Sequence, residues 1–130
     1  KEKVQNMGCF LGVKTHTALS MIVEIGDFNR FEKAPKFAGF LGLVPSENSS
    51  GDDRNRYSIT KAGNSHLRRL MVEAAQSYTR GNIGHKSIAL RLRRRFYKMT
   101  LNKGINRNVA TTAIARELAC FMWGMATGNI

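Results

Sequence analysis

The sequence predicts an all-α fold, a compact bundle of about five helices interrupted by one long polar loop. Only two prolines, Pro35 and Pro45, occur in the 130 residues, so long helices can run without interruption after position 45. Apolar residues recur at intervals of three and four over most of the chain, which is the period of an amphipathic helix. Hydrophobic residues make up 42% of the total, enough for one domain with its own core.

The first part of the chain predicts two helices. One spans residues 16–26, and Gly26 is its expected stop. The other is short, spans residues 34–41 and has Pro35 in its first turn. The positions expected to face the core are Ala18, Met21, Ile22 and Ile25 in the first helix and Phe37, Phe40 and Leu41 in the second.

A polar segment with a Ser-Gly motif follows. Residues 42–60 are rich in Ser, Gly, Asn and Asp, which predicts a long loop with room for a small hairpin near its end. A loop of this length inside a compact domain usually has a function. Ser50, which precedes Gly51, is the candidate nucleophile, and Ser49 is the runner-up. The same residue types also describe an ordinary exposed loop, and that alternative stays open.

Three further helices are predicted after the loop. Residues 64–80 and 86–101 form two basic helices, separated by glycines. Residues 107–126 form a helix whose apolar residues lie on several sides and not on a single amphipathic face, which predicts the central core helix. The expected core positions, in the order of these helices, are Leu67, Leu70, Met71, Ala74, Ala75 and Tyr78; Ile88, Leu92, Phe96 and Met99; and Val109, Ala113, Leu118, Phe121, Met122 and Met125.

Positive charge is concentrated in the later part of the chain. The formal net charge is +12; residues 1–50 carry six Lys/Arg and five Asp/Glu, whereas residues 51–130 carry fifteen and four. This uneven excess predicts a polyanion partner more than a uniformly solubilised surface. A membrane surface is the competing partner, but no apolar run reaches the roughly 18 residues of a span. We therefore expect a cytoplasmic protein without a membrane partner.

No metal or cofactor site is predicted within this chain. Cys9 and Cys120 lie among apolar neighbours, which predicts buried free thiols of the kind found in a reducing compartment. The two cysteines and three scattered histidines do not have the spacing of a metal site.

Basic residues form three candidate groups of phosphate contacts. One group follows the Ser-Gly motif, where positive potential would favour a scissile phosphate. Another lies at the start of the 64–80 helix, where backbone N–H groups add donors. The last covers several sides of the 86–101 helix, which fits phosphate contact better than base reading. These candidate nucleic-acid-binding residues are Arg54, Arg56, Lys61, Asn64, Arg68, Arg69, Arg93, Arg94 and Arg95.

Residues 10–26 begin with a segment that resembles part of a helix-hairpin-helix clip for the DNA backbone. In such a clip, glycines in a tight hairpin let backbone N–H groups approach phosphate. Gly12 supplies one of these glycines, and Lys14 stands where the second usually lies. An ordinary connection between two helices is the alternative.

Four short motifs together resemble a known family. They are FLGLVP at residues 40–45, SSG at 49–51, ITKAGN at 59–64 and LRR at 67–69. They closely resemble the C-terminal domain of DEDD-type insertion-sequence transposases, relatives of the Piv DNA invertases that include the bridge-RNA-guided recombinases. The resemblance extends over about residues 10–128 and implies that residues 1–130 are a single C-terminal transposase domain.

The resemblance also implies a chemistry. By position, Ser50 would attack a DNA phosphate and form a covalent phosphoserine. Asp52 and Asp53 stand where the family usually has a glycine or a basic residue, so the local charge is less favourable. Full-length members carry an N-terminal RuvC-like nuclease domain that binds divalent metal, Mg²⁺, and they form homo-oligomers. In these, the serine domain of one subunit meets the nuclease domain of another.

We therefore expect a DNA transposase or recombinase whose isolated serine domain is inactive, because the nuclease domain is missing from it. The main alternative is a non-catalytic basic helical domain that binds DNA or guide RNA. A third hypothesis is a cationic amphipathic protein that docks on membranes. A phosphoserine adduct would separate the first hypothesis from the second.

Overall fold

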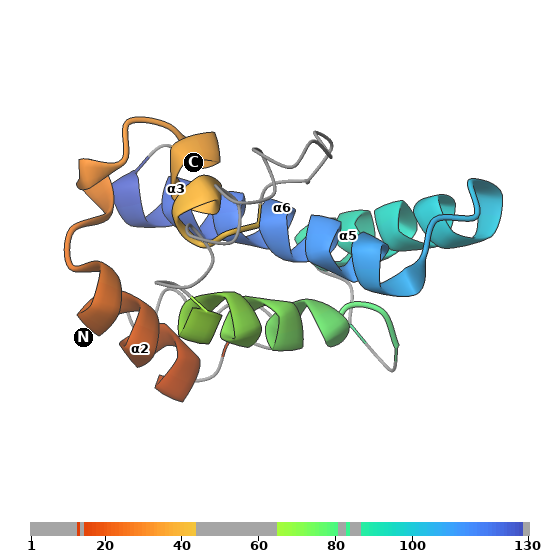
Figure 1. Cartoon of the computed structure of the whole chain (residues 1–130), viewed down its shortest axis with the longest axis horizontal. Helices are drawn as coiled ribbons and strands as arrows, with labels where there is room; N and C mark the ends of the chain where they lie inside the picture. The colour runs from red at the N-terminus through yellow and green to blue at the C-terminus, as the bar shows by residue number, and fades with distance from the viewer. Residues whose placement is uncertain (1–12, 14, 44–64, 81–82, 84–86, 129–130) are drawn as a thin grey trace, which may run out of the picture.

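The described part of the chain is an all-α bundle (Figure 1). The computed structural model describes residues 13, 15–43, 65–80, 83 and 87–128, and within these no strand forms, which confirms the predicted fold class. The elements are α2 (Thr15–Ile25), the 3₁₀ turn η1 (Phe28–Arg30), α3 (Ala34–Phe40), a helix over residues 65–76, α5 (Ser87–Tyr97), the π-helical turn η2 (Lys98–Asn102) and α6 (Arg107–Thr127).

Helix α6 is the centre of the core, as predicted. It runs along the long axis of the molecule and contacts α3, α5, η1 and η2 (Figure 1). Ala110, Ile114, Leu118 and Met122 recur every four residues along it and are fully buried. The prediction for Val109 was wrong, because this side chain is 58% exposed. The next two residues, Ala110 and Thr111, are buried, so Val109 lies on the side of α6 that faces away from the core.

Short caps and glycines end the early helices where the sequence predicts. Gly26 has φ +78° directly after α2, a conformation that favours glycine. The Asp27 side chain then accepts a hydrogen bond from the Asn29 backbone N–H at 2.9 Å and starts η1. Phe37 and Leu41 are buried as predicted, whereas Phe40 is only half-buried. The Arg30 guanidinium lies 4.8 Å from the centroid of the Phe40 ring, so this ring has a cation on its face.

The two basic helices are shorter than predicted. The first regular helix stops at residue 76, and turns at 77–79 bury Tyr78. The second ends at Tyr97, and η2 follows instead of a helix that continues to residue 101. The Lys103 N–H donates to the Lys98 carbonyl, a five-residue spacing that widens the last turn. Gly104 then reverses the chain with φ +68°.

Two parts of the predicted organisation lie outside the described residues. They are most of the glycine-bearing segment before α2 and residues 44–60 of the serine loop. Both stay predictions. None of the described helices is long and apolar enough to cross a membrane.

Candidate nucleic-acid interface

Helix α5 has a cationic outer side. Positions three, four and seven apart lie on one side of a helix. Arg91, Arg94, Arg95 and Lys98 have this spacing, and all four are exposed. The opposite side packs on the core through Leu92 and Phe96. We call the four exposed cations the α5 basic face.

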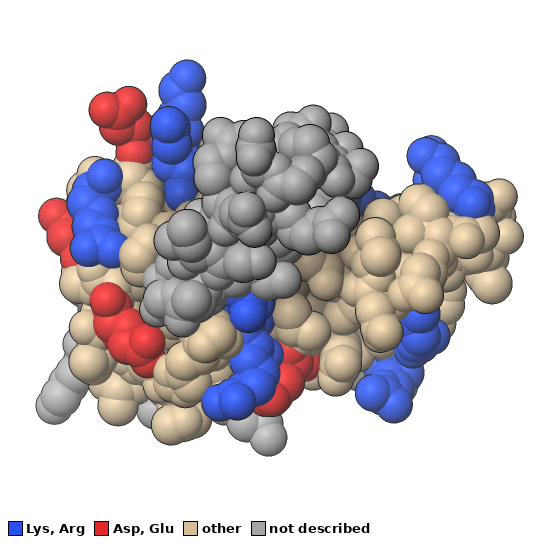
Figure 2. All heavy atoms as spheres, in the orientation of Figure 1, with Lys and Arg blue, Asp and Glu red and all other residues tan. Residues whose placement is uncertain are grey.

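The surroundings of this face contain little negative charge. Residues 74–116 hold ten Lys/Arg and no Asp or Glu. On the side shown in Figure 2, the outer end of the molecule carries only Lys and Arg among its charged groups, while Asp and Glu gather over the other half. A phosphate backbone would therefore meet a mainly positive surface, in which Glu117 on α6 is the acidic group that contacts the basic face.

Arg93 has a different role from its two neighbours. It lies on the inner side of α5 and is half-buried. Its Nε donates a hydrogen bond to the Tyr78 backbone carbonyl at 2.8 Å, in the turn that ends the 65–76 helix. A cation at a helix C-terminus also interacts favourably with the helix dipole. Arg93 thus joins two helices, whereas Arg94 and Arg95 are exposed and do not make this contact.

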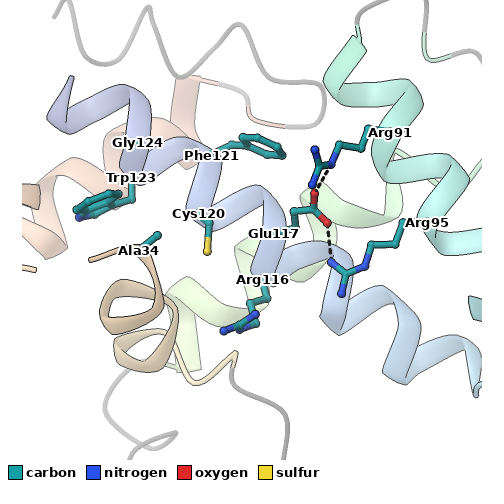
Figure 3. A pocket seen from close by; sticks show the side chains of 9 residues that line it. All are labelled: Ala34, Arg91, Arg95, Arg116, Glu117, Cys120, Phe121, Trp123 and Gly124. Atoms are coloured by element: carbon teal, nitrogen blue, oxygen red, sulfur yellow. Dashed lines mark hydrogen bonds and ion pairs between the residues drawn. The ribbon is translucent and has the colours of Figure 1, made fainter. Parts of the chain in front are cut away.

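Glu117 on α6 holds two arginines of the basic face. Its Oε2 accepts from Arg91 Nε at 2.7 Å, and its Oε1 accepts from Arg95 Nη1 at 2.5 Å (Figure 3). The Glu117 side chain is only 13% exposed, whereas Arg91 is 70% exposed. One carboxylate therefore fixes two guanidinium groups while most of the Arg91 side chain stays open to solvent. Sequence reasoning missed this contact, although Glu117 is the only acidic residue after Glu73.

A pocket of about 550 Å³ lies beside these two ion pairs, between α5, α6 and the start of α3. Three arginines line it, Arg91, Arg95 and Arg116 (Figure 3). Phe121 and Trp123 supply aromatic surface, and the Arg91 guanidinium carbon lies 5.8 Å from the Phe121 ring centroid. Arginine and aromatic side chains together suit the phosphates and bases of a nucleic acid.

Comparison of the sequence with known proteins identifies the family of the chain. Residues 9–88 match the family described as "Transposase IS116/IS110/IS902 family". The chain belongs to this transposase family. No solved structure matches it.

Curated relatives of this transposase-family chain are also named as transposases. "Putative transposase y4qE" of Sinorhizobium fredii is 39% identical over 88% of the chain and 34% of the relative. "Transposase for insertion sequence element IS1111A" of Coxiella burnetii is 30% identical over 97% and 33%. "Transposase for insertion sequence element IS1328" of Yersinia enterocolitica is 29% identical over 97% and 36%. The chain thus spans about a third of the length of these relatives.

The structure describes only part of the predicted site in this transposase-family chain. Arg69 is exposed and Arg68 half-buried on the 65–76 helix. His66 Nδ1 on that helix lies 2.6 Å from Glu24 Oε2, which links it to α2. The other predicted residues lie outside the described part and stay predictions; they are Ser49, Ser50, Arg54, Arg56, Lys61 and Asn64.

Cys120, a half-buried free thiol in the pocket wall, should react slowly. Burial raises the pKa of this thiol; the Arg116 guanidinium lowers it and the Glu117 carboxylate raises it. Because the thiolate is the reactive form, we expect slower alkylation in the folded chain than in urea. The folded-state rate should also keep rising at a pH where the rate of an unfolded thiol has levelled off. Iodoacetamide labelling with mass spectrometry separates Cys120 from Cys9, and equal rates in both states would contradict this.

Proposed function

We propose that this chain is the serine-bearing domain of a DNA transposase and that it holds DNA phosphates with the α5 basic face. Family membership and the names of the relatives support the reaction class. The binding role is supported by one observation: Arg94 and Lys98 are exposed on one side of α5, within a stretch (residues 74–116) that contains no Asp or Glu. Cations on a rigid helix can neutralise phosphates without reading bases.

Ser50 is the proposed nucleophile. Its Oγ would displace one bridging oxygen of a phosphodiester, cut that strand and keep the phosphate as a phosphoserine. A hydroxyl of a second DNA strand could then attack the phosphoserine and restore a phosphodiester. Arg54 and Arg56 would stabilise the negative charge that develops on the phosphate, and Asp52 would oppose them.

The remaining parts of the proposed reaction belong to the rest of the protein. We propose a nuclease domain elsewhere in the full-length protein that holds divalent metal. We also propose a homo-oligomer that brings a partner's nuclease domain to the serine. Among the described residues, no three His, Cys, Asp or Glu side chains gather into a group that could hold a metal ion. A guide RNA is a second candidate for the basic face, because RNA presents the same phosphates.

The salt dependence of DNA binding tests this proposal. Each phosphate contact on duplex DNA changes the slope of log affinity against log salt by about 0.9. Removing Arg94 and Lys98 together with alanine should therefore flatten the slope by up to about 1.8. Fluorescence anisotropy with a labelled duplex at several salt concentrations measures this slope, and an RNA competitor shows which nucleic acid binds more tightly.

Arg93→Ala is the matched control, because it removes one positive charge from the inner side of the same helix. It should lower the unfolding midpoint by removing the hydrogen bond to Tyr78, and it should leave the slope unchanged. A slope that is unaffected by the Arg94 and Lys98 changes would show that the basic face is only solvated surface.

A further inference from the structure

The α5–α6 hairpin ends in a projecting tip, residues 98–109. Helix α5 and the first turns of α6 lie side by side, and η2 with the following loop joins them at one end of the long axis of the molecule (Figure 1). This end is the part of the described chain that lies farthest from α2 and α3 in that view. The tip can therefore reach a surface that the body of the domain does not touch.

Hydrogen bonds and packing fix the tip on the body. The Ile105 N–H donates to the Met99 carbonyl at 2.9 Å, and the Thr100 hydroxyl donates to the Phe96 carbonyl at 3.0 Å. The Tyr97 hydroxyl donates to the Thr79 carbonyl at 3.2 Å, which ties the base of the hairpin to the turn after residue 76. A side chain on this tip is held in position before any partner binds, so little ordering entropy remains to be lost.

The tip exposes an apolar side chain among cations. Leu101 is 77% exposed, the most exposed large apolar residue in the described chain, and Val109 is 58% exposed. Lys98, Lys103 and Arg107 are exposed within the same twelve residues, and the tip contains no Asp or Glu. Single exposed leucines are common and need no functional explanation. Leu101 differs from them because it lies on a projecting hairpin that also exposes three cations.

The charge of the tip indicates which kind of partner would bind it. Three cations and the amino end of α6 give the tip a positive potential, so an anionic surface is favoured. A protein groove or a lipid surface would need a broader apolar area than two side chains supply. Duplex DNA fits better, because proteins that bend DNA insert one apolar side chain between base pairs while nearby cations hold the phosphates.

We propose that Leu101 is a wedge that enters the base stack of duplex DNA, with Lys98, Lys103 and Arg107 on the flanking phosphates. This rests on the proposed function, because it assumes that DNA is the partner. It adds that the domain distorts the duplex as well as holding it. Flexible steps such as TA would be the preferred points of entry, since unstacking costs least there.

The test uses the 130-residue chain and a short duplex with 2-aminopurine beside a TA step. Binding should raise the 2-aminopurine fluorescence as the base unstacks, and dyes on the two duplex ends should report a bend. Leu101→Ala should abolish the fluorescence rise and weaken binding about tenfold, which corresponds to the burial of part of one leucine. Its salt slope should not change, because no charge is removed. Leu101→Met should keep most of the signal.

Val23→Ala is the control, because Val23 is 70% exposed on α2, in the half of the molecule away from the tip. It should leave both signals as they are. An unchanged fluorescence rise in Leu101→Ala, or an equal loss in Val23→Ala, would overturn the wedge. Salt-dependent binding without any fluorescence rise would also overturn the wedge but keep the proposed DNA-binding role. A chain that binds no duplex at low salt would overturn both.

Discussion

Replacing Ser50 by alanine in the full-length transposase should abolish strand exchange and leave DNA affinity unchanged. The proposed reaction passes through a phosphoserine, and alanine has no atom that can form this bond. Loss of a nucleophile typically lowers the rate by about a thousandfold or more, so product should fall to background. Affinity should persist, because the basic face of α5 keeps its charges. A recombination assay measures the exchange, and mass spectrometry of the trapped adduct identifies the modified serine.

Ser49→Ala is the matched control, because it removes the neighbouring hydroxyl. It should reduce exchange only mildly and should keep the phosphoserine on Ser50. Undiminished recombination by Ser50→Ala would reject this residue as the nucleophile, and an adduct on Ser49 would move the role by one position. The 130-residue chain alone should give no exchange, because the proposed nuclease domain is missing.

The order and type of the helices could be predicted from the sequence because they depend on local rules. Apolar spacing located α2 and α6, and Gly26 marked a break that the structure confirms with a positive φ angle. The central position of α6 followed from apolar residues on several of its sides. These signals lie within one segment and need no knowledge of its neighbours.

Features that depend on neighbours could not be predicted in the same way. Periodicity cannot show that Val109 faces away from the core or that α5 changes to a π-helical turn at Lys98. Three adjacent arginines, Arg93 to Arg95, look equivalent in sequence, yet one binds the Tyr78 carbonyl and another binds Glu117. Replacing all three together would mix a loss of stability with a loss of phosphate contacts.

The candidate catalytic residue came from a motif and not from physical chemistry alone. The residue types around Ser50 fit an exposed loop as well as an active site. The resemblance over the Ser-Gly motif selected this serine, and family membership now supports the resemblance. The ion pairs of Glu117 with Arg91 and Arg95 are the opposite case, because they are visible in the structure and no sequence motif predicts them.

Truncating Phe96 to alanine should give the largest loss of stability among the changes considered. This ring is fully buried where the α5–α6 hairpin joins the core. The Arg107 guanidinium carbon lies 5.0 Å from its centroid, so the ring also supports one of the cations at the tip. Removing a buried phenylalanine usually costs about 3–5 kcal/mol, a large part of the 5–15 kcal/mol that stabilises a typical domain. Urea unfolding followed by far-ultraviolet circular dichroism measures the loss.

Phe96→Leu distinguishes the loss of packed volume from the loss of the aromatic ring. It keeps most of the apolar volume, so it should cost less than about 1.5 kcal/mol, part of which is the lost interaction with Arg107. Equal unfolding midpoints for the two variants would mean that the hairpin packs too loosely for volume to matter. If the leucine variant is folded and still binds DNA more weakly, its salt slope distinguishes the cause. A flatter slope means that Arg107 no longer reaches a phosphate, whereas an unchanged slope means that the wedge has shifted.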